Sequence, residues 1–211
     1  MTKKSIFSFT LVLLMIIAYG CSNSSEPIFN GKDLSNWKLV VDDDNVNPEE
    51  VFYVEDGIIN IKGQPFGYMY TKNEYKNFTL NLEYRWKEAA SNSGIFVMVQ
   101  DKEKPFPKTV ECQLHAGDAG DFVMILGAEL EEYVVPEGTE RPQYPVLAKR
   151  APSSEKPVGE WNKVKITAEN GVITVYINDV LQNSATSKVT KGNLALQSEG
   201  GGIQFRNITI N

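Results

Sequence analysis

The chain has 211 residues, of which 42% are hydrophobic, and this size fits one globular domain. Its formal net charge is -6, and no basic stripe interrupts the acidic composition. Nucleic acid is therefore excluded as an expected partner, because contacts to a phosphate backbone need a basic face.

The first 21 residues have the pattern of an export signal. Lys3 and Lys4 form a positive start, Ile6–Ala18 is an apolar run, and a small residue stands directly before Cys21. The run is too short and wrongly flanked for a membrane-spanning helix. The pattern resembles the lipobox of bacterial lipoproteins, which implies cleavage before Cys21, lipidation of its thiol and an anchored protein on the periplasmic or cell-surface side. A plain secretory signal is the alternative.

We expect a signal peptide over 1–20, a tether over 21–27 and one domain over 28–211. Residues 1–20 contain two lysines and no acidic residue, so the net charge without them is -8. Cys112 then has no intramolecular disulfide partner, and the fold must be held by its core. We interpret Cys112 as a small buried hydrophobe.

Short apolar alternations and turn signals predict an all-β domain. Asp56-Gly57 and Asn170-Gly171 mark two tight hairpins, because these pairs favour the backbone of a two-residue turn. The segment 129–157 is rich in Pro and charge and predicts a long excursion over one end of the domain. The pattern favours a two-sheet β-sandwich of jelly-roll type. The expected strands are 37–41, 51–54, 58–61, 68–71, 77–87, 95–99, the segment starting at 109, 122–126, 161–168, 172–178, 193–197 and 203–210.

The stretch from Thr109 to Asp118 carries the most informative pattern. Three apolar residues, the first of them Val110, alternate with Glu111, Gln113 and His115, the only histidine of the chain. Side chains two apart on a strand point to the same face, about 6.5–7 Å from one another. An extended strand would therefore present an acid, an amide and an imidazole in a row.

Four separated pieces of sequence resemble the 3-keto-disaccharide hydrolase domain family. Their order and spacing match over 28–211, although no single piece is specific. The resemblance implies a concanavalin A-like jelly roll that acts on, or binds, glycosides oxidised at C3 of the sugar. The pieces are Phe29–Trp37 (FNGKDLSNW), Asn92–Phe96 (NSGIF), Glu111–Gln113 (ECQ), and the closing group Gly159–Asn162 (GEWN), Leu196–Gln197 and Phe205–Ile208 (FRNI).

Two positions depart from the family pattern. The family usually has an acid where this chain has His115, and it often has a histidine after Leu-Gln, where this chain has Ser198-Glu199. Both departures touch the site that the resemblance implies.

The chemistry implied is an elimination followed by hydration. A ketone at C3 makes the proton on C2 acidic, so a base can remove it and the enolate can expel the group on C1. Such a site needs a base, a donor for the enolate oxygen and an acid for the leaving group. We assign the base to Glu111 or His115, the contact with the keto or hydroxyl oxygens to Arg85, and a hydroxyl contact to Gln113. The other expected substrate-binding residues are Asn92, Glu83, Tyr68, Gln197 and Glu199.

Each of these residues also has a structural interpretation. Glu111 and Arg85 could form a cross-strand ion pair, and His115 could be a hydrogen-bonded residue at a strand end. No cofactor is required by the sequence, but Glu111, His115 and Asp118 could form an oxygen-rich divalent metal site. Tyr68, Tyr70 and Phe66 could form a wall of the cleft.

Two other functions stay open. A conventional glycosidase needs a second carboxylate near Glu111, which Glu83, Asp118 or Asp121 could supply. A lectin-like module would bind carbohydrate without turnover.

Overall fold

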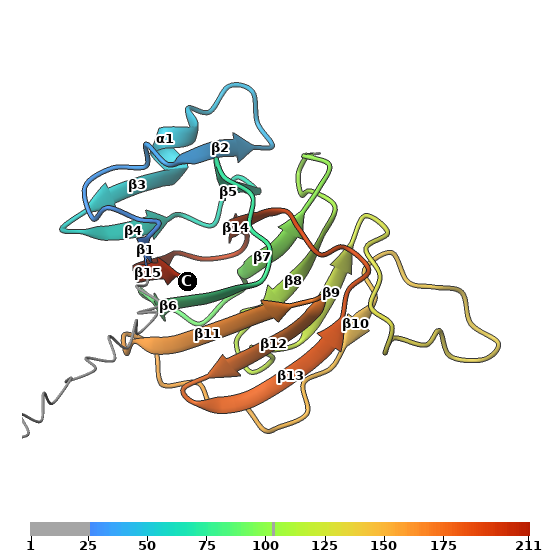
Figure 1. Cartoon of the computed structure of the whole chain (residues 1–211). Helices are drawn as coiled ribbons and strands as arrows, with labels where there is room; N and C mark the ends of the chain where they lie inside the picture. The colour runs from blue at the N-terminus through green and yellow to red at the C-terminus, as the bar shows by residue number, and fades with distance from the viewer. Residues whose placement is uncertain (1–25, 103) are drawn as a thin grey trace, which may run out of the picture.

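The computed structural model describes residues 26–102 and 104–211, and it contains two antiparallel β-sheets packed face to face (Figure 1). The expected export signal and Cys21 lie outside these residues. Within the described part, no helix is long and apolar enough to cross a membrane. The predicted all-β jelly-roll sandwich is confirmed.

Sheet A contains eight strands, in the order β13-β12-β11-β6-β15-β4-β3, and β1 also pairs with β15. Every pairing in it is antiparallel. Its members are β1 (Glu26–Pro27), β3 (Phe52–Glu55), β4 (Ile58–Ile61), β6 (Phe78–Trp86), β11 (Asn162–Glu169), β12 (Val172–Ile177), β13 (Val180–Thr186) and β15 (Ile203–Ile210).

Sheet B contains seven strands in the order β10-β9-β8-β7-β14-β5-β2. One short helix, α1 (Pro48–Val51), precedes β3. The members of the sheet are β2 (Trp37–Val41), β5 (Gly67–Thr71), β7 (Gly94–Val99), β8 (Thr109–Gln113), β9 (Phe122–Ile125), β10 (Val146–Leu147) and β14 (Asn193–Ser198).

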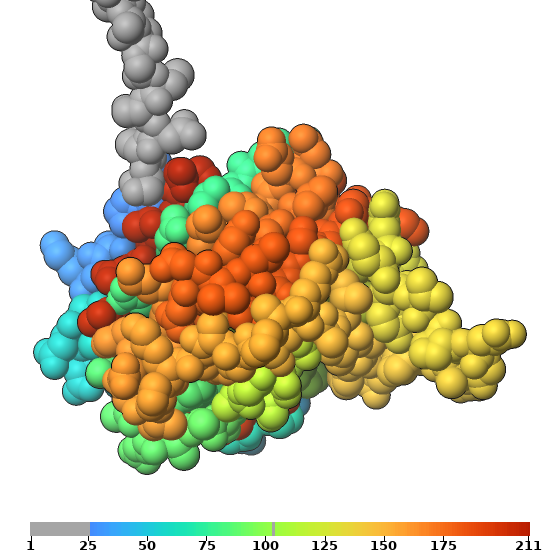
Figure 2. All heavy atoms as spheres, turned by 90° about the horizontal axis from the view of Figure 1, so that it is seen from below, coloured from blue at the N-terminus to red at the C-terminus, as the bar shows by residue number. Residues whose placement is uncertain are grey.

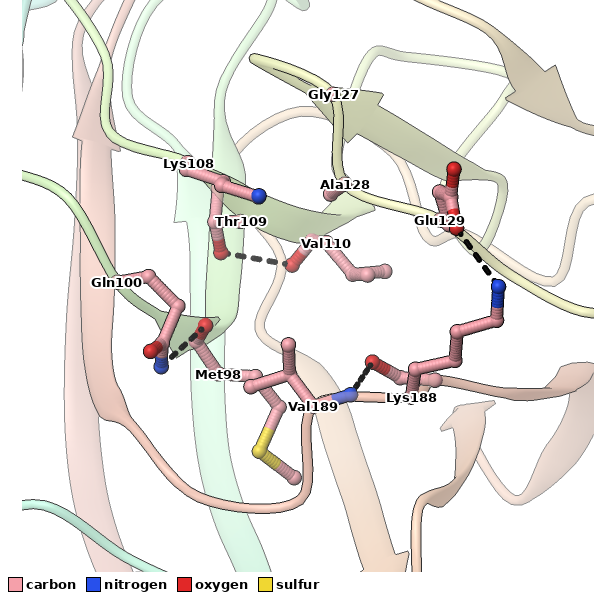
Figure 3. Close-up of a pocket in the computed structure, with 11 residues that line it drawn as sticks. Met98, Gln100, Lys108, Thr109, Val110, Gly127, Ala128, Glu129, Lys188 and Val189 are labelled. Atoms are coloured by element: carbon pink, nitrogen blue, oxygen red, sulfur yellow. Dashed lines mark hydrogen bonds and ion pairs between the residues drawn. The ribbon is translucent and has the colours of Figure 1, made fainter.

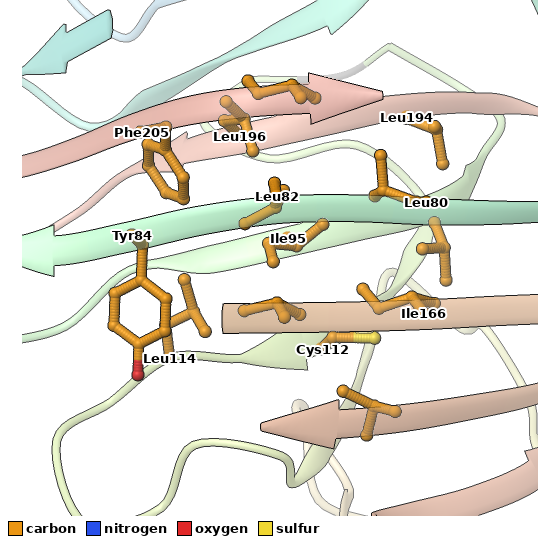
Figure 4. Close-up of a cluster of buried hydrophobic side chains, with 14 of the residues drawn as sticks. Leu80, Leu82, Tyr84, Ile95, Cys112, Leu114, Ile166, Leu194, Leu196 and Phe205 are labelled. Carbon is orange, nitrogen blue, oxygen red and sulfur yellow. The ribbon is translucent and has the colours of Figure 1, made fainter. Parts of the chain in front are cut away.

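The main core lies between the two sheets (Figure 4). In β6 every second residue is buried, from Phe78 to Trp86, and the residues between them are half-buried. This alternation is what a strand with one face on a core requires. Cys112 belongs to this core with 1% of its surface exposed, as predicted, and burial raises the pKa of its thiol.

Sheet B is covered on its other face as well. A second apolar cluster lies there, and the half-buried Val40, Tyr70 and Phe106 pack against it. All six residues of β7 are consequently buried, which explains its nearly continuous apolar sequence. The buried members of the cluster are Tyr68, Phe96, Val99, Val123, Ile125 and Ala195.

Three elements differ from the sequence-based expectation. Strand β13 was missed because its sequence, VLQNSAT, is polar at its centre. Its buried Gln182 and Asn183 donate side-chain hydrogen bonds to the carbonyls of Pro152 and Leu147, at 3.3 and 3.0 Å. Helix α1 was not expected, and its last residue, Val51, lies in the expected strand 51–54. Strand β1, which we had assigned to the tether, pairs Glu26 with Ile210.

The excursion over 129–157 is present as predicted. It contains the two-residue strand β10, which pairs with β9, and an isolated bridge between Leu130 and Ser187 attaches its beginning to the body. Its outer part projects from the sandwich as the yellow segment of Figure 2.

Candidate active site

Strand β8 places Glu111 on the face of sheet B that points away from the main core. Val110 and Cys112, its neighbours, point into that core. Glu111 is opposite Phe96 on β7 and is 3% exposed. A Cβ atom on Gly94 would lie 2.7 Å from both Cγ and Cδ of Glu111, so the absence of a side chain at position 94 leaves the space that the carboxyl occupies.

The environment of Glu111 favours its neutral form. Burial raises the pKa of this carboxyl well above its ordinary value, and the negative charge of Glu199 raises it further. The buried Oε1 atom has no hydrogen-bond partner among the described residues. A buried, protonated carboxyl can donate a proton to a bound substrate.

Glu199 is the second carboxyl of the site. It follows β14, and its Oε2 accepts a 2.7 Å hydrogen bond from Nε2 of Gln197. Burial raises the pKa of Glu199, whereas hydrogen bonds from Gln197 and Asn92 act in the opposite direction. Glu199 was expected only as a contact for substrate, and its electrostatic effect on Glu111 was not predicted.

Two more buried acceptors belong to this group. Oδ1 of Asn92 and Oε1 of Gln197 are buried and have no partner within the described part of the chain. Buried polar atoms normally have a hydrogen-bond partner, so several unpaired ones around two carboxyls are typical of a site that awaits a polar ligand. Asn92 and Gln197, two of the expected substrate-binding residues, thus lie beside Glu199.

His115 lies beyond the end of β8, and the expectation of one extended strand from Thr109 through His115 is therefore wrong. Oε1 of Gln113 accepts the backbone N–H groups of Leu114 and His115 at 3.1 and 3.0 Å, and this contact accompanies the turn away from the sheet. The row of three side chains consequently ends at Gln113. That oxygen serves the backbone of the turn and is not free to orient a substrate hydroxyl.

The imidazole of His115 is half-exposed and is held by an acid. Its Nδ1 is 2.9 Å from Oδ2 of Asp118, and Lys149 lies 3.3 Å from the other oxygen of that carboxylate. The hydrogen bond with His115 and the contact with Lys149 lower the pKa of Asp118. An ionised Asp118 favours the tautomer with the proton on Nδ1, which leaves Nε2 as a proton acceptor. His115 also interacts electrostatically with Glu199.

Arg85 and Glu83 do not lie with Glu111, and this corrects our assignment of both. They belong to β6 in sheet A and point outward on the opposite side of the sandwich. Nε of Arg85 donates to Gln204 at 2.7 Å, and Glu83 accepts from Arg206 at 2.6 Å. An ion pair between Glu111 and Arg85 is therefore also wrong.

Tyr68 is part of the floor beside the site instead of a cleft wall. Its ring is fully buried, and the ring centroid lies 6.1 Å from that of Phe96. In the sheet, Tyr68 pairs with Gln197. Phe66 is 37% exposed and stacks on Phe106 at 5.8 Å between ring centroids. The packing of Phe106 against Phe66 was not predicted, because the loop that carries Phe106 has no strand periodicity.

The expected metal ligands are not gathered into one group. Among the described residues, no three His, Cys, Asp or Glu side chains are arranged to hold an ion. His115 contacts Asp118, but Glu111 is buried in the sheet face and does not join them.

A separate cavity of about 300 Å³ lies near the opposite end of β8 (Figure 3). Thr109 and Val110 line it, and the ion pair between Lys188 and Glu129, at 3.0 Å, stands at its edge. Because Gln113 and His115 lie at the other end of the strand, this cavity is distinct from the candidate active site.

Solved structures of carbohydrate-related proteins share the fold. A protein from Parabacteroides distasonis, described as a candidate glycosyl hydrolase, is 25% identical with a TM-score of 0.64, covering 90% of this chain and 99% of that one. The carbohydrate-binding module CBM66 from Bacillus subtilis is 14% identical with a TM-score of 0.59, covering 84% and 96%, and shows the fold alone. The fold class is that of the jelly-roll sandwiches found in glycosidases and carbohydrate-binding modules.

The chain belongs to the family of 3-keto-alpha-glucoside-1,2-lyase-like domains, whose model matches residues 24–211. A 3-keto-disaccharide hydrolase from Bacteroides thetaiotaomicron is 25% identical over 176 residues, covering 72% of this chain and 55% of that protein. This chain thus spans about half the length of that relative. The family indicated by the four sequence pieces is confirmed.

Proposed function

We propose that this protein cleaves 3-keto-glycosides by elimination and hydration. A base removes the proton on C2, the electron pair passes into the ketone at C3 as an enolate, and the enolate then expels the oxygen on C1. Water adds to C1 of the resulting enone and a proton returns to C2, which gives net hydrolysis. The observation that carries the proposal is the pair formed by buried Glu111 and half-buried Glu199, beside an imidazole that Asp118 holds.

Each group then has a role that its surroundings support. Nε2 of His115 takes the C2 proton, because Asp118 favours the proton on Nδ1. Protonated Glu111 gives its proton to the departing oxygen, since burial keeps this carboxyl neutral. The unpaired oxygens of Asn92 and Gln197 accept substrate hydroxyls.

The test compares a 3-keto-glucoside with its unoxidised parent, with and without chelator. We expect cleavage of the oxidised compound only. Glu111→Gln and His115→Ala should each lower kcat by about 10²–10⁴-fold, the usual contribution of a general acid or base. Glu83→Gln makes the same chemical change on the far sheet and should keep full activity. Full activity in both site variants would end the proposal.

A conventional glycosidase is the second candidate, and the electrostatic contact between Glu111 and Glu199 favours it. Glycosidases use two carboxyls at about 5–5.5 Å or about 6.5–9.5 Å. Cleavage of the unoxidised parent at a comparable rate would support this candidate. Saturable binding of the sugar without turnover of either compound would instead indicate a lectin-like module.

A further inference from the structure

A row of planar side chains crosses the outward face of sheet A, on the opposite side of the molecule from Glu111. The antiparallel register pairs Tyr53 with Asn60, Asn60 with Gln204, and Gln204 with Arg85. We call these four residues the amide row. Since neighbouring strands are about 4.8 Å apart, the row extends about 14 Å across β3, β4, β15 and β6.

Hydrogen bonds hold the amide row in place. Nε of Arg85 donates to Oε1 of Gln204 at 2.7 Å, and Nε2 of Gln204 donates to Oδ1 of Asn60 at 2.6 Å. Asn60 in turn donates to the carbonyl of Ile58 at 3.2 Å. The guanidinium of Arg85 lies over the ring of Trp161, 4.6 Å from its centroid. Groups fixed in this way lose little freedom when they bind a ligand.

The amides are buried although they point away from the core. Asn60 is 3% exposed and Gln204 is 7% exposed. Buried side-chain amides are unusual on the outward face of a sandwich, where residues are normally solvated. The two amides of the row are therefore largely shielded from water, unlike the side chains of an ordinary polar surface.

A cavity of about 220 Å³ opens directly on the amide row. Asn60 and Gln204 contribute to it together with the ring of Tyr53, and Lys62, Lys87 and Glu88 stand around them. An aromatic ring beside fixed amides is the usual composition of a site for a polar ligand with apolar faces. The three ionisable residues, two lysines and one glutamate, leave a net charge of +1 around the cavity, whereas Tyr53, Asn60 and Gln204 inside it are uncharged.

We propose that this cavity is a second carbohydrate site, which binds one unit of an uncharged saccharide chain. Sugar hydroxyls both donate and accept hydrogen bonds, as the amides of Asn60 and Gln204 do, and the carbon face of a sugar ring can lie on Tyr53. The site does not depend on the proposed function, because it shares no side chain with the group around Glu111.

Two connecting segments run from this cavity to the candidate active site. The segment between β6 and β7 contributes Lys87 and Glu88 to the cavity and Asn92 to the active site. The segment between β14 and β15 contributes Gly202 and Glu199 in the same way. A saccharide held at the second site is thus kept close to the end of the sandwich where the chemistry is proposed.

The experiment is affinity electrophoresis of the full domain in native gels that contain laminarin or inulin, two uncharged polysaccharides. We expect at least one of them to retard the wild type. Tyr53→Ala and Lys87→Ala should weaken this binding, the first by about tenfold or more, as is typical when an aromatic anchor is removed. Tyr53→Phe should bind nearly as well as the wild type, because it keeps the ring. Tyr144→Ala is the matched control, since Tyr144 is an exposed tyrosine on the excursion.

Thermal unfolding of each variant shows whether a loss of binding reflects a loss of fold. Lys87 is exposed on the rim, so Lys87→Ala keeps the test valid even if Tyr53→Ala unfolds. The proposal is overturned if neither polysaccharide retards the wild type, or if folded Tyr53→Ala and Lys87→Ala both bind as the wild type does. Retardation by acidic alginate alone would overturn the preference for an uncharged chain.

Discussion

At the residue scale, Gly94 and Glu111 share a volume that holds only one side chain. A methyl group at position 94 would collide with the buried carboxyl of Glu111, which would have to move. We expect Gly94→Ala to lower both the melting temperature and the cleavage of the keto-glycoside. In a Glu111→Ala background the same substitution should cost about 1–3 kcal/mol less, because the collision is gone. Equal costs in both backgrounds, measured by urea unfolding, would contradict this.

The protonation of Glu111 gives a second prediction at this scale. In the unfolded chain the carboxyl loses its proton near its ordinary pKa of 4.5, whereas the folded protein retains it to a higher pH. The folded state then binds more protons, so the free energy of unfolding falls as pH rises above that value. The Glu111→Gln variant has no carboxyl at this position, so its free energy of unfolding does not fall with pH for this reason. Its stability relative to the wild type should increase by up to about 1.4 kcal/mol per pH unit.

Urea unfolding between about pH 5 and about pH 8 measures this difference. Glu83→Gln is the control for removing a carboxyl on the other sheet, where it pairs with Arg206. A difference for Glu111→Gln that stays constant with pH would show that the buried carboxyl ionises normally.

The sequence predicted which face of each strand a residue occupies, but not which sheet the strand joins. Parity placed Glu111 correctly opposite to Cys112 and placed Arg85 correctly opposite to the core residues of β6. It could not reveal that β6 and β8 belong to different sheets, because that depends on pairings between distant segments. For the same reason, the sequence could not reveal that the charge of Glu199 raises the pKa of Glu111.

At the element scale, the turn that carries His115 is tied to the excursion by Glu155. One oxygen of Glu155 accepts from the hydroxyl of Tyr84 at 3.0 Å, and the other accepts from the backbone N–H of Gly117 at 2.7 Å and from Ser153 at 3.0 Å. Tyr84 belongs to β6, so this carboxylate connects three separate parts of the chain. It therefore fixes the turn that presents His115 and Asp118.

A double-mutant cycle tests this connection. We expect Tyr84→Phe and Glu155→Ala each to destabilise the fold, and their coupling energy to be about 0.5–3 kcal/mol, as is usual for residues in one buried network. Glu155→Ala should also reduce kcat, because His115 loses its fixed position. Additive unfolding energies would show that the hydrogen bond between the two residues adds nothing to stability.

Most strands were predictable because their alternation is clear, and the exceptions have local causes. Strand β8 ends at Gln113, where a side-chain oxygen accepts the backbone N–H of His115 and shares that of Leu114 with the carbonyl of Ser93, an arrangement that hydrophobic periodicity does not register. Strand β13 was not predicted because Gln182 and Asn183 are buried polar residues. Their hydrogen-bond partners are backbone carbonyls of the excursion. Both cases depend on side-chain hydrogen bonds to a backbone.

At the scale of the whole molecule, the two sheets differ in how their outer faces are used. The outer face of sheet B carries the apolar cluster and the candidate active site, and that of sheet A carries the amide row. We propose that a lipid at Cys21 anchors this sandwich after export. Cys21→Ser should move the protein from the membrane fraction to the soluble fraction of the producing cells. Retention of the variant in the membrane fraction would indicate an uncleaved signal, and a soluble wild type would indicate a plain secretory signal.

The pairing of β1 with the last strand places Glu26 directly beside Ile210. A few added residues could therefore join these two ends of the domain, and new termini could be opened in the excursion, which contributes little regular pairing. The gene for this domain thus lends itself to circular permutation, in which the order of strands along the chain changes while their neighbours in space stay the same.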